Sequence, residues 1–204
     1  EEGAKIAQDS TICSGSLPGS PESTVKVFMA TPLHRLPLLH WNANKVGIGY
    51  AKLEEKWATV ISFSYHLWSA KVNKDPVIFP YPNQKDVPLD FFGERPNPIP
   101  DDHDKMAGFP ITVTWYKGNP PRNITAELRT LKGESIDSWL STPDHPLIKC
   151  GGWEHLGMYI MSKDQLKPNT EYKVTLTGMY KDLPWEKAWQ FTTGGKSEVA
   201  QIIR

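Results

Sequence analysis

Between residues 167 and 176 the chain reads KPNTEYKVTL, a turn signal followed directly by a strand pattern. Pro168 and Asn169 favour a turn, and the three apolar residues of the following segment alternate with polar ones. Alternation with a period of two places every second side chain on the same face of a strand. This stretch therefore predicts a half-buried strand that is entered through a tight turn.

The same alternation recurs along the second half of the chain. It is found at Ile111/Val113/Trp115, Ile124/Ala126/Leu128, Met158/Ile160, Tyr172/Val174/Leu176 and Trp189/Phe191. Several short strands separated by turn signals are typical of an antiparallel β-sandwich of immunoglobulin-like type. We expect Trp115 and Trp189, which lie in phase with the apolar positions, to be core residues.

The overall composition agrees with a mainly β protein. The 204 residues include 18 prolines, and proline disfavours helices but suits turns and strand ends. The 23 basic and 23 acidic residues give no net charge, which argues against a nucleic-acid-binding protein. No apolar run approaches the roughly 18 residues of a membrane-spanning helix.

The first part of the chain has a different pattern. Ser20 and Pro21 form a helix-start signal, Val25, Phe28 and Met29 share one helical face, and Pro32 ends the helix. Two alternating segments follow, Val46/Ile48/Tyr50 and Trp57/Thr59/Ile61/Phe63/Tyr65, which predict half-buried strands.

A proline-rich stretch from Pro76 to Pro110 marks the change between the two patterns. We therefore expect a partial α/β portion over residues 1–75, a β-sandwich over residues 76–194 and a polar tail over residues 195–204. The predicted fold class is mainly β, with the α/β portion preceding the antiparallel immunoglobulin-like sandwich.

Two motifs in the first portion carry a family resemblance. Thr31-Pro32-Leu33-His34-Arg35 at the helix end, followed by the strand Val46-Gly47-Ile48-Gly49, resembles the last third of bacterial secreted CAP-superfamily domains, the relatives of cysteine-rich secretory and pathogenesis-related proteins. The remainder is similar to the β-sandwich found behind CAP domains in some large secreted proteins. The resemblance implies an extracellular, cell-surface or periplasmic location.

The resemblance also implies what the site would need. CAP domains hold a cavity lined by two histidines and two acids, which binds a divalent metal in some members. His34 matches the second histidine, whereas the other three positions would precede residue 1. One imidazole cannot hold a metal that takes about four ligands. We therefore expect no cofactor unless another segment completes the site, and packing at a helix end is the alternative role of His34.

Three further groups of residues are candidate sites. Asp101, Asp102 and Asp104 are a possible cation loop, or a solvated loop. Cys13 and Cys150 are a possible disulfide, or two separate thiols. Trp139, Trp153 and Trp185 lie outside clean alternation and are possible ligand-binding aromatics, or covers of a core edge.

No complete catalytic motif is present, so we expect a non-enzymatic binding or scaffold protein within a larger assembly. An upstream CAP fragment or another protein subunit is the expected partner, because Val25, Phe28 and Met29 would need a covering layer. One alternative is a hydrolase or metal-binding CAP protein whose site is completed across an interface, with His34 contributing. The other is a carbohydrate-binding sandwich, with polysaccharide as its ligand.

Overall fold

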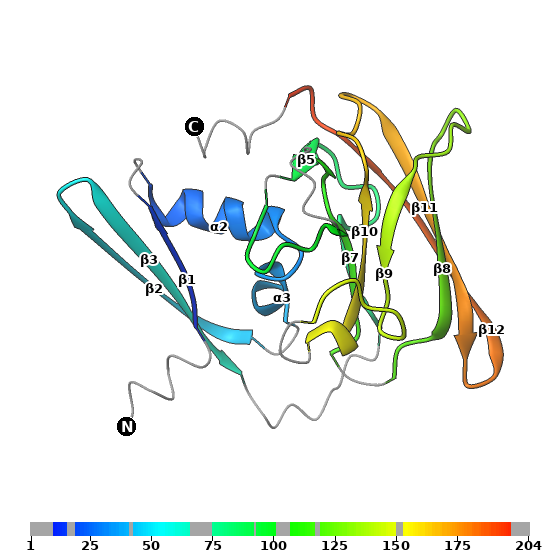
Figure 1. Ribbon diagram of the computed structural model, residues 1–204, viewed down its shortest axis with the longest axis horizontal. Helices are drawn as coiled ribbons and strands as arrows, with labels where there is room; N and C mark the ends of the chain where they lie inside the picture. Colours follow the sequence, from blue (N-terminus) through cyan, green and yellow to red (C-terminus); the bar gives the residue numbers. More distant parts are fainter. Residues whose placement is uncertain are drawn as a thin grey trace. The chain divides into compact units, whose positions relative to one another are not determined.

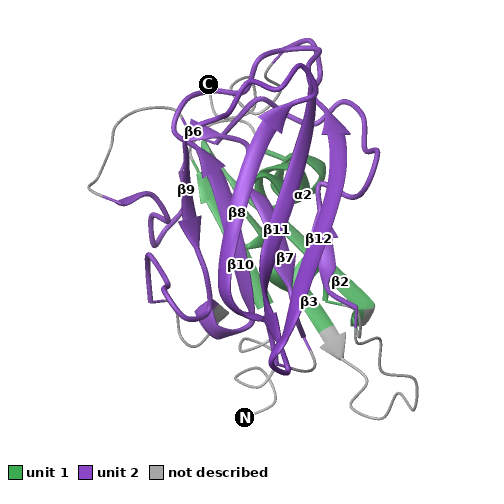
Figure 2. Ribbon diagram, turned by 90° about the vertical axis from the view of Figure 1, so that its right-hand side faces the viewer, with its two compact units in different colours: residues 1–73, 199–204 green, residues 74–198 purple. Residues whose placement is uncertain are grey.

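The computed structural model describes residues 10–15, 19–40, 43–65, 75–91, 93–100, 107–116, 119–149 and 153–196. The chain divides into two compact units, which are called unit 1 (residues 1–73 with 199–204) and unit 2 (residues 74–198) (Figure 2). Antiparallel strands dominate both units, which confirms the mainly β part of the predicted fold class (Figure 1). No helix in the described part of the chain has the length and apolar character to cross a membrane.

Unit 1 contains a three-stranded antiparallel sheet with a helix along one face. Its elements are β1 (Ser10–Gly15), α2 (Pro21–Ala30), α3 (Arg35–Leu38), β2 (Ala43–Leu53) and β3 (Lys56–Tyr65). The strands lie in the order β1-β3-β2. Within the described residues, β3 is therefore central, and β1 and β2 each have one neighbour.

Helix α2 begins where the sequence predicts. The Ser20 hydroxyl accepts a hydrogen bond from the Ser23 amide at 3.1 Å, and the Ser23 hydroxyl accepts one from the Ser20 amide at 2.8 Å. This reciprocal pair is a capping box, and it satisfies two backbone donors at the helix start. The helix ends at Ala30, and Thr31 is already extended, as expected for a residue that precedes a proline.

The core of unit 1 lies between α2 and the sheet. Phe28, Ile61 and Phe63 form its buried centre, and Val25 and Leu38 pack against them. Phe28 is only 3% exposed. The β3 side chains of the same unit therefore cover Phe28, and a partner that covers more of the α2 face stays a prediction.

Unit 2 is a β-sandwich-like arrangement of two larger antiparallel sheets and a short strand pair. Its strands are β4 (Val77–Phe79), β5 (Asp90–Phe91), β6 (Ala107–Gly108), β7 (Ile111–Thr114), β8 (Arg122–Thr130), β9 (Ser138–Ser141), β10 (Gly157–Ser162), β11 (Glu171–Tyr180) and β12 (Leu183–Thr192), with the short 3-10 helix η2 (Trp153–His155) before β10. The two larger sheets have the orders β4-β7-β10-β9 and β12-β11-β8, and β5 pairs with β6.

The alternation of apolar and polar residues predicts which side chains are buried in the core of unit 2. Val174 and Leu176 of β11 are fully buried, whereas Lys173 between Tyr172 and Val174 is exposed. Trp115 and Trp189 are 5% and 6% exposed, which confirms that both are core residues. Strands β11 and β12 are joined by Lys181 and Asp182, both with positive φ, as a tight primed hairpin turn requires.

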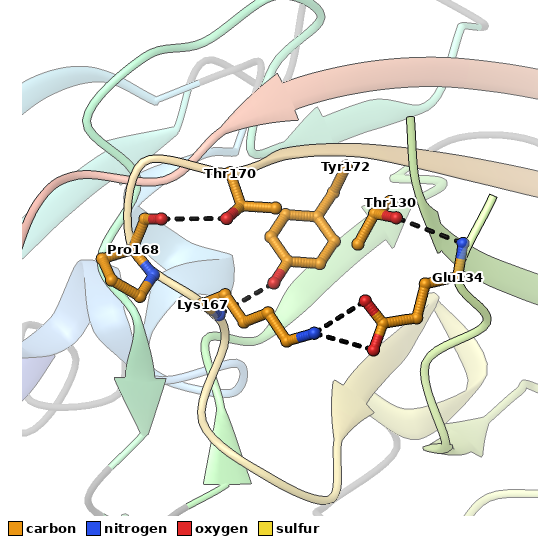
Figure 3. A network of polar contacts seen from close by, with 6 residues as sticks. All are labelled: Thr130, Glu134, Lys167, Pro168, Thr170 and Tyr172. Atoms are coloured by element: carbon orange, nitrogen blue, oxygen red, sulfur yellow. Dashed lines mark hydrogen bonds and ion pairs between the residues drawn. The ribbon is translucent and has the colours of Figure 1, made fainter. Parts of the chain in front are cut away.

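A network of polar contacts ties the entry of β11 to the neighbouring loop (Figure 3). The buried hydroxyl of Tyr172 accepts a hydrogen bond from the Lys167 amide at 2.8 Å. The Lys167 ammonium contacts the Glu134 carboxylate at 2.7 Å, and this carboxylate raises the pKa of Lys167. The Glu134 amide in turn donates to the Thr130 hydroxyl at 3.2 Å. The turn predicted at residues 167–169 is thereby held at Lys167, through its amide by Tyr172 and through its ammonium group by Glu134.

Candidate functional site

The most unusual surface of unit 1 is its edge strand β2. This strand is long for a globular protein, at 11 residues, and pairs only with β3 in the described part of the chain. Its segment Val46–Ala51 has neither a charged residue nor a proline. Natural edge strands usually carry such residues, or are short, because an open edge pairs readily with other strands. The Val46–Ala51 segment, called the β2 edge below, has none of these protections.

The apolar side chains of the β2 edge point to the same face as the core. The register places Val46 opposite Phe63, Ile48 opposite Ile61 and Tyr50 opposite Thr59. Residues directly opposite in an antiparallel pair share one face. The β3 partners are buried beside α2, whereas Val46, Ile48 and Tyr50 remain 56%, 52% and 45% exposed. The apolar layer of unit 1 therefore continues past the helix onto an uncovered strip.

This exposure corrects one sequence-based expectation. The alternation of Val46, Ile48 and Tyr50 predicted a half-buried strand, whereas in the structure all three residues are exposed to solvent. Alternation shows on which face a side chain lies. It does not show whether the next layer extends far enough to cover that face.

The opposite face of the β2 edge is flat. Gly47 and Gly49 alternate with the apolar residues, and a methyl group added at either glycine would meet no atom within 4 Å. A glycine inside a strand can mark a site that another backbone approaches closely.

Two contacts hold the β2–β3 hairpin against the chain that leads into α2. The Tyr50 hydroxyl donates a hydrogen bond to the Gly19 carbonyl at 3.0 Å. The Trp57 ring lies directly against Gly19, where there is no room for a side chain. Tyr50 is therefore held by its hydroxyl while its ring remains partly exposed.

His34 lies in the turn between α2 and α3 and packs against an aromatic ring. Its imidazole stacks on Phe28 with a centroid distance of 5.1 Å and an interplanar angle of 6°. Next to it, Arg35 is fully buried and donates from Nε to the Met29 carbonyl at 2.7 Å. No group of three or more His, Cys, Asp or Glu side chains suited to a metal is found in the described residues. The metal-binding role of His34 stays a prediction that depends on another segment.

The candidate tryptophans are placed in different parts of unit 2. Trp139 of β9 packs against a buried cluster that includes Tyr159 and Met161. Trp185 of β12 is partly exposed and makes an edge contact with Trp115, at a centroid distance of 6.1 Å. It also lines a depression of about 350 Å³, together with Asn123, Thr177, Gly178, Met179, Pro184 and Glu186. The side chain of Trp153 lies outside the described residues.

The other predicted site residues are only partly described. Asp101, Asp102, Asp104 and Cys150 lie outside the described residues, as does most of the predicted tail at 195–204. Cys13 forms no disulfide with another described residue, and burial raises the pKa of its thiol against the opposing effect of a hydrogen bond with Thr24. The cation loop and the disulfide therefore stay predictions.

The β2 edge was not identified as a site from the sequence. The signal was present, because Val46-Gly47-Ile48-Gly49-Tyr50 combines strand alternation with an absence of charge. What the sequence could not supply was the strand order, which makes β2 an edge.

Comparison with known proteins gives no family assignment. No protein-family model matches the sequence. No curated protein matches it either. Among solved structures, the chain is similar to CopC from Methylosinus trichosporium OB3b, with 10% identity over 60% of this chain and 94% of that chain, and a TM-score of 0.36. A likeness at this level does not establish a shared fold.

Proposed function

We propose that this chain is a non-enzymatic binding or scaffold protein of a larger extracellular, cell-surface or periplasmic assembly, and that the β2 edge is its protein-binding surface. The observation that supports this proposal is the 45–56% exposure of Val46, Ile48 and Tyr50 on an unprotected edge strand. Such an edge offers an apolar row, and its outward backbone groups pair with no other strand in the described part of the chain.

The mode of binding follows from these two properties. An extended segment that pairs with β2 would satisfy its free backbone groups, and alternate side chains of that segment would extend the apolar row. Main-chain hydrogen bonds would supply much of the affinity. Specificity would come from the apolar contacts with Val46, Ile48 and Tyr50 on the helix-bearing face of the sheet.

Two finer assignments of the fold belong to the same proposal. Strand orders β4-β7-β10-β9 and β12-β11-β8 correspond to the two sheets of an immunoglobulin constant-type sandwich, and Tyr172 makes the hydrogen bond of a tyrosine corner. In unit 1, helix α2 between β1 and the β2–β3 hairpin agrees with the CAP-like interpretation of the motifs around His34 and Gly47.

The experiment compares three forms of the 204-residue chain as baits for proteins of its native source. Ile48→Lys places a charge in the middle of the apolar row. Leu183→Lys is the matched control, because Leu183 is also an exposed apolar strand residue, 68% exposed, but belongs to unit 2. The proposal predicts that proteins retained by the wild type and by Leu183→Lys are lost with Ile48→Lys. Retention of the same proteins by all three baits would contradict it.

A second candidate function rests on the depression beside Trp185. An aromatic ring next to the polar groups of Asn123, Thr177 and Glu186 is a combination that can contact a sugar ring and its hydroxyls. Carbohydrate binding would quench tryptophan fluorescence in a titration with soluble oligosaccharides. The quenching would disappear in Trp185→Ala and remain in Trp139→Phe, and a titration without any change would exclude this function.

A further inference from the structure

We propose that the β2 edge binds the β2 edge of a second copy of this chain, with the two strands antiparallel about a two-fold axis at Ile48. This inference rests on the proposed function, since it names the partner of the same surface. In the proposed register Ile48 lies opposite Ile48, Gly47 opposite Gly49, Val46 opposite Tyr50, and Lys45 opposite Ala51. Two sheets of order β1-β3-β2 would then form one continuous sheet.

The first argument is that the β2 edge is complementary to itself. Across the axis, the exposed Val46 and Ile48 of one copy face the exposed Tyr50 and Ile48 of the other, all on the helix-bearing face. Pairs of aromatic with β-branched residues are among the most favourable cross-strand pairs. The exposed strip of each copy is thereby covered by the same strip of its partner, as a two-fold symmetric interface requires.

The second argument is electrostatic. The only charge in the paired segment is Lys45, which lies opposite Ala51. The two Lys45 residues are therefore six positions apart along the paired strands, or roughly 20 Å. This separation exceeds the screening length of about 8 Å at physiological ionic strength. Lys45 of one copy lies one position from Lys52 of the other, but the pleat places their side chains on opposite faces of the sheet, so self-pairing puts no like charges on the same face at close range.

The third argument concerns the choice of register. A shift that pairs Ile48 with Tyr50 would place Val46 opposite Lys52, with a charge at the end of the apolar row. A shift by a single residue would turn the apolar row of one copy toward the glycine face of the other. The register centred on Ile48 is the one that keeps Val46, Ile48 and Tyr50 together and leaves both lysines of β2 outside the row.

The size of the contact sets the expected strength. Seven residues from each copy form a small interface, and interfaces of this size are typically weak and transient. We expect a dimer with a dissociation constant of about 1–100 μM, the range of such contacts. Ile48→Lys would place two ammonium groups on the axis and weaken the dimer at least about tenfold.

The register is tested by disulfide trapping in 204-residue chains that carry Cys13→Ala and Cys150→Ser. In an antiparallel pair, directly opposite residues have Cβ atoms about 4.5–5.5 Å apart, close to the spacing that a disulfide needs. Ile48→Cys alone should therefore form a covalent dimer on oxidation. Val46→Cys and Tyr50→Cys should each remain largely monomeric alone but crosslink when mixed. Equal crosslinking in all samples, or none in any, would overturn the proposed register.

The oligomeric state separates this inference from the proposed function. Light scattering up to about 200 μM should show a concentration-dependent dimer for the wild type and for Leu183→Lys, and a dissociation constant at least about tenfold higher for Ile48→Lys. A monomeric wild type that still retains other proteins through Ile48 would refute self-pairing and leave the proposed function standing. A monomer that retains no protein in an Ile48-dependent way would refute both.

Discussion

Replacing Gly19 by alanine tests how the start of α2 is held against the sheet. The added Cβ would come closer than van der Waals contact to three atoms of the Trp57 ring. Trp57 is half-buried on the same face of β3 as Ile61 and Phe63, so either its ring or the chain that leads into α2 must move. Overpacking of this kind costs about 1–3 kcal/mol.

Gly47→Ala is the matched control, because the same methyl group is added to the same unit. Its Cβ would meet no atom within 4 Å, and Gly47 lies inside strand β2. Alanine in a strand interior is favoured over glycine by about 0.5–1 kcal/mol, because it loses less backbone entropy on folding. The two substitutions should therefore change the stability of unit 1 in opposite directions.

The assay is hydrogen exchange of the α2 and β3 amides, which reports on unit 1 separately from unit 2. A loss of about 1–3 kcal/mol corresponds to exchange about 5- to 150-fold faster in Gly19→Ala. Gly47→Ala should exchange at the wild-type rate or more slowly. If Gly19→Ala exchanged within twofold of the wild type, the packing of Trp57 against Gly19 would be refuted as a restraint on α2.

Two further predictions concern unit 2. Tyr172→Phe keeps the ring but leaves the Lys167 amide without its acceptor, so it should lower the free energy of unfolding by about 1–3 kcal/mol. Thr170→Val removes an exposed hydroxyl and should lower it much less. A urea titration that finds equal effects for the two variants would contradict this prediction. Burial raises the pKa of Tyr159 to about 12, and its hydroxyl donates to the Pro98 carbonyl at 2.8 Å. Because the unfolded phenol ionises near pH 10, the contribution of this group is complete below pH 10 and is lost as the pH rises toward 12, an effect of roughly 2 kcal/mol. Tyr159→Phe should therefore unfold with a shallower pH dependence over that range, and an unchanged dependence would show that the Tyr159 hydroxyl is not responsible.

The start of helix α2 and the buried faces of the strands in unit 2 can be predicted from local sequence patterns. Ser20 and Pro21 identify the start of α2 because capping involves residues within one helical turn. Trp115 and Trp189 are identified as core residues because alternation within a strand assigns them to the buried face. These predictions succeed because the interactions that decide them lie close together in the sequence.

The candidate site was missed because it depends on contacts between distant segments. Phe28 is buried by Ile61 and Phe63, which follow it by more than 30 residues, so the sequence did not show that α2 is covered. Val46 and Ile48 are exposed because β2 lies at the edge of the sheet, and strand order is not encoded in their alternation. Long-range pairing therefore decides which apolar face is buried and which remains open for a partner.

The most direct test of the account is amide exchange of residues 45–51 at two protein concentrations, about 5 and about 200 μM. If the β2 edge pairs with a second copy, its amides should exchange more slowly at the higher concentration, while those of β12 should be unaffected. Ile48→Lys should reduce the difference, because the variant dimer is at least about tenfold weaker. Equal exchange of residues 45–51 at both concentrations would contradict self-pairing, and the edge strand would then need a different partner.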